Sequence, residues 1–258
     1  MFHKLRKYLS LLLAFLLGLG TVLGVGLFTP TPSPALPPLG GLLLNGVQYI
    51  QLSHLSTKQK IELGQQVHKQ LLSKYKLDND PETNAYVSRV GKRVAAASDC
   101  PQYPFHYYVV EDRNINAFAT TGGNVYVNKG LLKAADNEDQ LAAVLAHETG
   151  HNCDNDLVNK MKQSDLAQGL ASVTGVDQSA VAGLAYKLAF ELPNSRQDEY
   201  NADAQGLKYI EKAGYDRNAM PAFLKKLLNS SSSPAFLSDH PGTKERIAVL
   251  QKKIAASQ

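Results

Sequence analysis

The chain has 258 residues, of which 44% are hydrophobic and 19% are charged. This composition predicts a folded protein with one fair-sized domain or two small ones, and it excludes a disordered chain. The formal net charge is +4, and residues 1–36, which contain three basic and no acidic residues, hold +3 of it. The nearly neutral remainder has no basic stripe, which argues against a nucleic-acid partner.

The N-terminal segment, residues 1–28, has the pattern of a signal peptide or of a single transmembrane anchor. Met1–Lys7 is short and basic, whereas Tyr8–Phe28 is apolar, uncharged and just long enough to span about 30 Å of hydrocarbon. A basic flank keeps the N-terminus inside, so we expect a membrane-anchored or exported protein with the rest of the chain on the non-cytoplasmic side. Residues 29–55 begin with a cluster of prolines and are expected to be a Pro-rich linker.

Two helices and a small sheet are expected next. Ser56 and Gln59 can form a capping box for a helix that ends near Tyr75, and Asp80-Pro81 supplies the N-cap and first residue of a second helix. Aromatic and β-branched residues predict a strand at Phe105–Glu111. Two further strands, at Ile115–Thr121 and Asn124–Asn128, flank the hairpin signal Gly122-Gly123.

An apolar helical run then carries the pattern H-E-x-x-H at residues 147–151. Residues four apart share a helical face, so His147 and His151 can direct two imidazoles at one ion, and neutral imidazoles suit Zn²⁺. Glu148 lies at the edge of such a site, where it can take a proton from a zinc-activated water. Gly150 costs a helix about 1 kcal/mol relative to Ala, so we expect a backbone or ligand packed closely against it. The alternative is two exposed histidines on an amphipathic helix.

A second acidic segment, Ser195–Asp203, follows the Ala- and Gly-rich stretch Asp165–Leu192, for which we expect a helix with a break near Gly175. A catalytic zinc takes three protein ligands and leaves one position for water. Glu199 and Asp203 share a helical face, so one carboxylate can bind zinc while the other fixes the tautomer of a ligating histidine. A solvated acidic face is the alternative for this segment taken alone.

Gly214 is expected to end the helix that carries Glu199, and two more helices separated by Ser230–Ser233 complete the chain. Helices, a small sheet and then mostly helices indicate an α+β, predominantly helical fold.

Cys153 points away from the ligand face of the motif and is not a ligand. Cys100 and Cys153 can form a disulfide outside the cytoplasm, or stay as two buried thiols.

Together these segments resemble the zinc metallopeptidase family that contains the CAAX prenyl endopeptidases, HtpX and BepA, over residues 56–254. The resemblance implies a zincin-like domain at residues 56–258 with a small sheet beside the metal helix, and one Zn²⁺ per chain. His147, His151 and Glu199 would be its ligands and Glu148 the general base. The single candidate span favours the soluble-domain branch of the family. Further similar segments are Asn116-Ala117-Phe118, Gly130-Leu131-Leu132, Ala213-Gly214-Tyr215-Asp216, His240-Pro241 and Glu245-Arg246-Ile247.

The intact motif favours a zinc endopeptidase that cleaves unfolded or misassembled envelope or membrane proteins in protein quality control. A non-catalytic chaperone or assembly factor with the same cleft is the alternative, and zinc aminopeptidases are the runner-up within catalysis. The expected partners are unfolded or misfolded protein chains and, through the N-terminal segment, the membrane.

Two further features bear on regulation and substrate. A sheet edge typically borders the cleft in peptidases of this kind, so we expect an extended substrate to pair with the strand Asn124, Val125, Tyr126, Val127, unless this is a plain structural hairpin. His240 precedes Pro241 and therefore lies outside helical geometry. The resemblance places it near the active site, with three roles open: a helix-capping turn, a donor to the oxyanion, or a lid that fills the fourth zinc position.

Overall fold

The structure is a computed structural model that describes residues 54–164, 178–230 and 233–256, all within the compact unit Pro38–Gln258. The predicted signal or anchor, nearly all of the Pro-rich linker and the predicted break near Gly175 lie outside the described residues. Within the described ranges, none of the helices combines the length and the apolar character needed to cross a membrane.

The first two helices begin at the predicted caps. α3 (Thr57–Leu72) starts with a capping box, in which Ser56 Oγ accepts the N–H of Gln59 and the Gln59 side chain accepts the N–H of Ser56 at 2.9 Å. α4 (Pro81–Ala96) starts at Asp80, whose carboxylate accepts two backbone N–H groups of the first turn. Both caps are local, which is why the sequence predicted them correctly.

The sheet has three strands, β1 (His106–Val110), β2 (Ala117–Ala119) and β3 (Asn124–Asn128), in the order β1-β3-β2. β3 runs parallel to β1 and antiparallel to β2, and the predicted hairpin joins β2 to β3. Gly122 and Gly123 adopt φ values of 71° and 94°, a left-handed region that favours glycine.

The expectation that Asn124–Asn128 offers a free edge to a substrate is wrong. β3 is the central strand, it pairs on both sides, and all five of its residues are buried. The edge strands are β1 and β2. Alternation of polar and apolar residues shows only to which face of the sheet each side chain points, so the same pattern fits an edge strand and a central strand.

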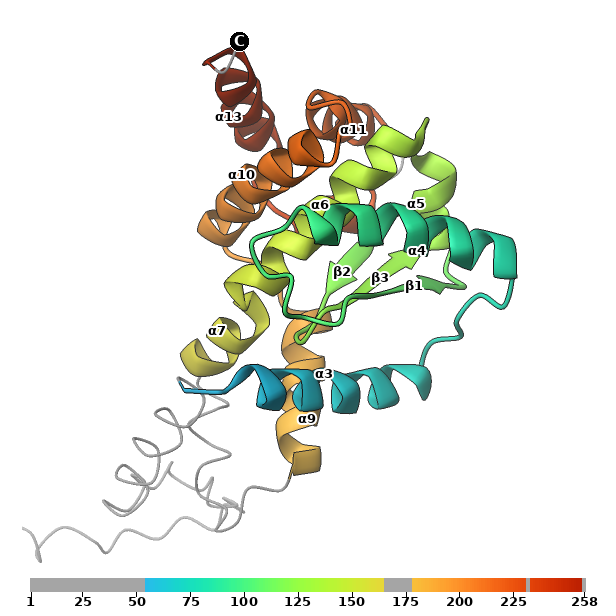
Figure 1. Cartoon of the computed structure of the whole chain (residues 1–258), viewed down its shortest axis with the longest axis vertical. Coiled ribbons are helices and arrows are strands. Elements are labelled where there is room, and N and C mark those ends of the chain that lie inside the picture. Colours follow the sequence, from blue (N-terminus) through green and yellow to red (C-terminus); the bar gives the residue numbers. More distant parts are fainter. Residues whose placement is uncertain (1–53, 165–177, 231–232, 257–258) are drawn as a thin grey trace, which may run out of the picture. The chain divides into compact units, whose positions relative to one another are not determined.

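Helices cover both faces of this sheet (Figure 1). α4 and α6 (Glu138–Asp154) pack on the face that carries Val109, Val125 and Val127. Tyr126 and Val110 point to the other face and pack with side chains of α3, α7 (Asp156–Gln163) and α9 (Gln178–Glu191). The short helix α5 (Lys129–Ala134) follows β3 directly.

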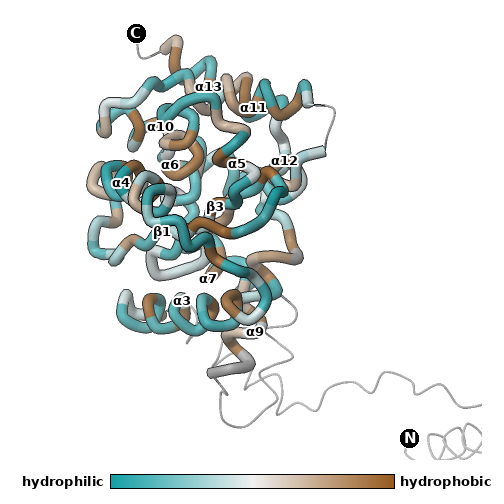
Figure 2. Tube along the Cα trace, turned by 90° about the vertical axis from the view of Figure 1, so that its right-hand side faces the viewer, coloured by the Kyte–Doolittle hydropathy of each residue, from teal (hydrophilic) through white to brown (hydrophobic). Residues whose placement is uncertain are grey.

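A further helical layer lies beyond α6, as Figure 2 shows from the side. It contains α10 (Arg196–Lys212), α11 (Ala219–Leu228) and α13 (Thr243–Ala256), and α10 packs along α6. A Cβ added at Gly150 would lie 3.1 Å from Ala202 Cα, and one added at Gly206 would lie 3.1 Å from His147 N. The expected close packing at Gly150 is therefore present, and the backbone of α10 provides it.

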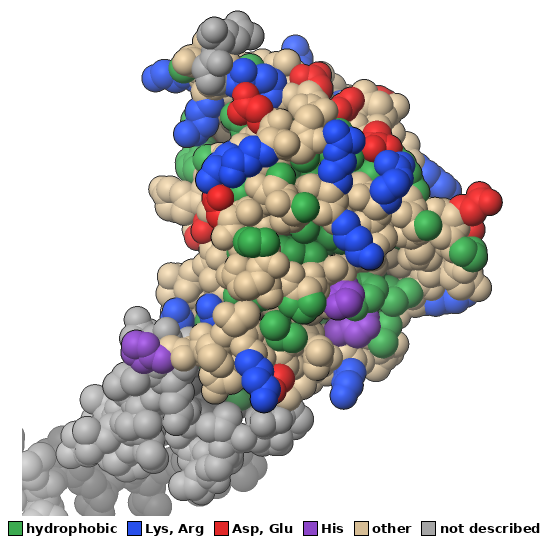
Figure 3. Space-filling view, in the orientation of Figure 1, with side chains coloured by type: hydrophobic (Ala, Val, Ile, Leu, Met, Phe, Trp, Pro, Cys, Tyr) green, Lys and Arg blue, Asp and Glu red, His purple; other side chains and the backbone are tan. Residues whose placement is uncertain are grey.

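The chain after Gly214 contains one helix more than expected, because the five-residue α12 (Ala235–Asp239) precedes α13. The fold is α+β and predominantly helical, as predicted. On the face drawn in Figure 3, basic and acidic side chains are interspersed over the helices and hydrophobic side chains form small groups.

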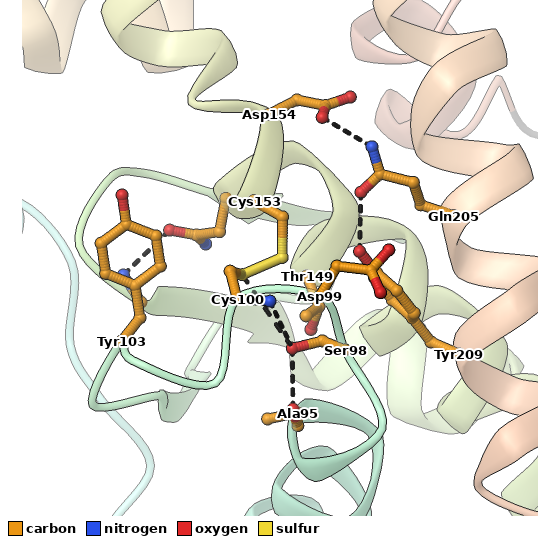
Figure 4. Close-up of a disulfide and its surroundings, with 12 residues drawn as sticks. Ala95, Ser98, Asp99, Cys100, Tyr103, Thr149, Cys153, Asp154, Gln205 and Tyr209 are labelled. Carbon is orange, nitrogen blue, oxygen red and sulfur yellow. Dashed lines mark hydrogen bonds between the residues drawn. A yellow bond between two sulfur atoms is a disulfide. The ribbon is translucent and has the colours of Figure 1, made fainter. Parts of the chain in front are cut away.

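Cys100 and Cys153 form a disulfide (Figure 4), which decides between the two alternatives that the sequence left open. It joins the loop after α4 to the last turn of α6, two residues beyond His151. Next to it, the Tyr103 hydroxyl donates to Asn155 Oδ1 at 2.7 Å. The end of the helix that carries both motif histidines is thereby tied to the rest of the domain.

Candidate metal centre

Four buried side chains from three parts of the fold converge on one point: His147 and His151 of α6, Glu199 of α10, and His240 directly after α12. Nε2 of His147 lies 3.1 Å from Nε2 of His151. Nδ1 of His240 lies 3.2 Å from His147 Nε2 and 3.0 Å from Glu199 Oε1. Glu199 also approaches Nε2 of each motif histidine to 3.3 Å.

These separations fit the ligand shell of a zinc ion. In a tetrahedron with Zn–N bonds of about 2.0–2.1 Å, ligand atoms lie about 3.3–3.4 Å from one another. Five of the six separations between the four groups are 3.0–3.3 Å, and all the ligand atoms lie within 4.8 Å of one another. Most of the groups therefore already stand at nearly the mutual distances that a shared ion would impose.

The tautomers of the three histidines support the same conclusion. In each ring, the nitrogen that faces away from the centre lies next to an oxygen that accepts a hydrogen bond, so that nitrogen donates, and in the neutral ring the nitrogen facing the centre then carries a lone pair. Three lone pairs and a carboxylate that face one another repel unless a cation lies between them. The outer pairs are His147 Nδ1 with Asp203 Oδ1 at 2.9 Å, His151 Nδ1 with Asp156 Oδ2 at 2.7 Å, and His240 Nε2 with the Ala117 carbonyl at 3.2 Å.

The charge around the centre is strongly negative. The site contains four buried carboxylates, those of Glu148, Glu199, Asp156 and Asp203, and one buried guanidinium, that of Arg246. Burial alone would raise the pKa of Glu199, but the imidazoles of His240 and His147 hold that pKa well below its usual range. An ionised carboxylate among imidazole lone pairs is a donor set suited to one Zn²⁺.

The predicted contact between Asp203 and a motif histidine is present, and Arg246 of α13 extends it. Arg246 is fully buried, and its Nε and Nη2 both donate to Asp203 at 2.7 Å. Its Nη1 lies 2.5 Å from Glu199 Oε2 and donates to the His240 carbonyl at 3.1 Å. One guanidinium therefore contacts three groups of the site.

No role was predicted for Arg246 beyond its place in the segment Glu245-Arg246-Ile247, because its partner Asp203 lies 43 residues earlier in the chain. Two more residues were missed. Asn194 donates to Glu199 Oε1 at 2.8 Å, and Asp156 contacts His151. Asp156 reaches back to the motif because Asn155 adopts a left-handed conformation with φ 58°. Asn tolerates this conformation better than most residues, so Asn155-Asp156 after the motif was a usable signal.

Glu148 differs from the other carboxylates. It is fully buried, and neither of its carboxylate oxygens has a hydrogen-bond partner among the described residues. Its nearest charged or polar contact is His240 Nε2, 3.5 Å from Oε1. A buried carboxylate without donors is costly and uncommon. Its free lone pairs are suited to accept a proton, which is the role that the motif predicts for this residue.

A cavity of about 210 Å³ lies beside this centre. Glu148, His151 and His240 line it, together with Phe118 and Ala119 of the edge strand β2. The volume is below the range of about 300–1,000 Å³ that is usual for sites that enclose a small-molecule ligand. A single side chain of an extended peptide suits this space better.

The chain is similar to known peptidases. The model of peptidase family M48 matches residues 81–254, which is more than half of the chain. The chain is 33% identical over 213 residues to the beta-barrel assembly-enhancing protease of Escherichia coli K12, covering 76% of this chain and 44% of that protein. It is 31% identical over 206 residues to the mitochondrial metalloendopeptidase OMA1 of Schizosaccharomyces pombe, covering 76% and 61%.

A third relative, the metalloprotease LoiP of Escherichia coli K12, is 26% identical over 230 residues, covering 84% of this chain and 88% of that protein. The chain spans about half the length of the beta-barrel assembly-enhancing proteases that it matches. The family match includes both the H-E-x-x-H motif and the Glu199 segment, and it confirms the resemblance found in the sequence. The chain belongs to peptidase family M48.

Proposed function

We propose that this chain is a zinc-dependent endopeptidase that cleaves unfolded or misassembled proteins of membranes or the cell envelope. The observation that carries the proposal is the pairing of a converged donor set, His147, His151, Glu199 and His240, with a buried carboxylate, Glu148, whose lone pairs are free. The first element holds a metal, and the second can move a proton beside it.

His147, His151 and Glu199 would hold the ion. Bound zinc would polarise the substrate carbonyl and lower the pKa of a water to about 7. Glu148 then takes the proton of the attacking water and passes it to the leaving amine. Asp203 and Asp156 keep the two motif histidines in the tautomer that presents Nε2 to the metal.

The edge strand β2 is the surface we propose for the substrate, in place of β3. In β2 the backbone of Ala119 faces away from β3, and neither its N–H nor its C=O has a partner among the described residues. Ala119 also lines the cavity that contains Glu148. An extended chain can pair here through backbone groups, a mode that tolerates many sequences and suits unfolded substrates.

Of the three roles considered for His240, the contacts favour the lid. Its Nδ1 faces the metal position, so four protein ligands would close a site that needs one open position for catalysis. Its Nε2 contacts the Ala117 carbonyl, and Phe236 N–H donates to the Ile115 carbonyl at 3.0 Å. The segment from Phe236 to His240 therefore occupies both the fourth position and part of the β2 edge. Substrate and lid would compete for the same place.

The quality-control role rests on the names of the relatives, which describe a protease that enhances β-barrel assembly and a mitochondrial metalloendopeptidase. The basic and apolar residues 1–28 support a membrane-anchored or exported protein with the catalytic domain on the non-cytoplasmic side. The disulfide is compatible with such a compartment.

The decisive test compares the wild type with Glu148→Gln, which keeps the shape of the side chain and removes its basicity. The variant should bind one zinc per chain, measured by elemental analysis, and should lose cleavage of an unfolded protein substrate. Glu62→Gln removes a charge from an exposed position of α3 and serves as the control. Equal turnover by Glu148→Gln at full zinc occupancy would contradict the mechanism.

A further inference from the structure

The cavity beside the metal centre is also lined by side chains of a different chemistry. Tyr75, Phe118 and Phe190 line it and form an aromatic subsite. The rings of Tyr75 and Phe190 stack at 5.8 Å, and Phe118 meets Phe190 edge-on at 4.4 Å. These residues come from the loop after α3, from the edge strand and from α9, so three separate elements enclose the space. Flat apolar walls of this kind suit an aromatic guest.

Asn128 is a buried polar residue that lines the same cavity. It is the last residue of β3 and 4% exposed, and it lines the cavity together with the aromatic subsite. Its Oδ1 is buried without a hydrogen-bond partner among the described residues, and its side chain does not cap α5. Rotation about the last side-chain bond exchanges oxygen and nitrogen, so the carboxamide can offer the cavity an acceptor or a donor.

A buried amide oxygen that accepts no hydrogen bond is uncommon in a folded protein and calls for a reason. The backbone of Asn128 is satisfied, because its N–H donates to the Asn116 carbonyl at 3.0 Å. A leucine of similar size would fill this position without an unpaired polar atom. The residue is therefore explained best by a partner that arrives with the substrate.

We infer that Asn128 and the aromatic subsite together select a tyrosine side chain of the substrate near the bond that is cut. The inference rests on the proposed peptidase function. Tyr75, Phe118 and Phe190 would enclose the ring, and the Asn128 carboxamide would hydrogen-bond its hydroxyl. Phenylalanine fills the same space but leaves the amide unpaired. A single hydrogen bond of this kind corresponds to a preference of up to about tenfold for tyrosine.

Binding to the zinc-loaded Glu148→Gln variant tests this without any cleavage. Two fluorescent peptides of Ala, Ser and Lys carry one central Tyr or one central Phe, so the aromatic residue can reach the subsite in any register. We expect the Tyr peptide to bind about tenfold more tightly. Adding Asn128→Leu should bring the ratio to about one, mainly by weakening the Tyr peptide. Thr121→Val is the matched control, because it removes a buried, unpartnered hydroxyl that does not line the cavity.

Each outcome decides the inference. Equal binding of the two peptides, no binding of either, or a Tyr preference that persists in Asn128→Leu overturns it. If Asn128→Leu does not fold, Asn128→Ala replaces it with the same expected ratio. Failure of the proposed function would give another result. The chain with Glu148 intact would then cleave neither of the two peptides and no unfolded protein, while the preference for Tyr in binding and its loss in Asn128→Leu would remain.

Discussion

Replacing Arg246 by methionine should destabilise the zinc-free protein by about 3–5 kcal/mol. The guanidinium is fully buried and makes two 2.7 Å hydrogen bonds to Asp203, so methionine leaves that carboxylate buried without its partner. Burial alone would raise the pKa of Asp203, but the hydrogen bonds from Arg246 and His147 hold it below its usual value. The predicted loss is a large part of a typical stability of about 5–15 kcal/mol.

Urea unfolding in the presence of a chelator measures this loss. The control is Lys208→Met, which breaks the pair of Lys208 with Asp99, both about half exposed, and should cost less than about 1 kcal/mol. The double variant Arg246→Met with Asp203→Leu should recover part of the loss, because it leaves no unpaired charge at that position. A change below about 1 kcal/mol in Arg246→Met would refute the idea that this buried pair holds α13 to α10.

Three other predictions concern the lid, the edge strand and the disulfide. His240→Ala should increase cleavage of an unfolded protein, with self-cleavage visible on a gel; unchanged turnover and zinc affinity would leave only a structural turn. Ala119→Pro should fold and bind zinc but should no longer cleave unfolded chains, because proline has no backbone N–H to pair with the substrate. The control Ala119→Val keeps that N–H and should retain cleavage. Normal cleavage by the proline variant would rule out pairing at β2. The Cys100–Cys153 bond spans 53 residues, so its reduction should lower the free energy of unfolding by about 4 kcal/mol in the chain-entropy model. Equal urea midpoints of the oxidised and reduced protein would contradict this.

The sequence alone determined those features of the protein that depend on residues close to one another along the chain. The spacing of His147 and His151 is set by the helical repeat, and the caps at Ser56 and Asp80 are set within one turn. Each of these features depends on a few adjacent residues, so a pattern reveals it. The close approach at Gly150 was also visible, because a glycine inside a helix has a local cost that needs a reason.

What the tertiary structure decided depends on residues far apart in the chain. The pairing of β1 with β3 made β3 the central strand and left β2 at an edge, and no period in the sequence distinguishes an edge strand from a central one. Arg246 meets Asp203 across 43 residues, and the direction of the His240 ring depends on how α12 packs beside β2. The partners of such residues are chosen by the packing of whole elements, in which many contacts are satisfied together. Local rules fix which groups a segment can offer, and only the fold fixes what those groups meet.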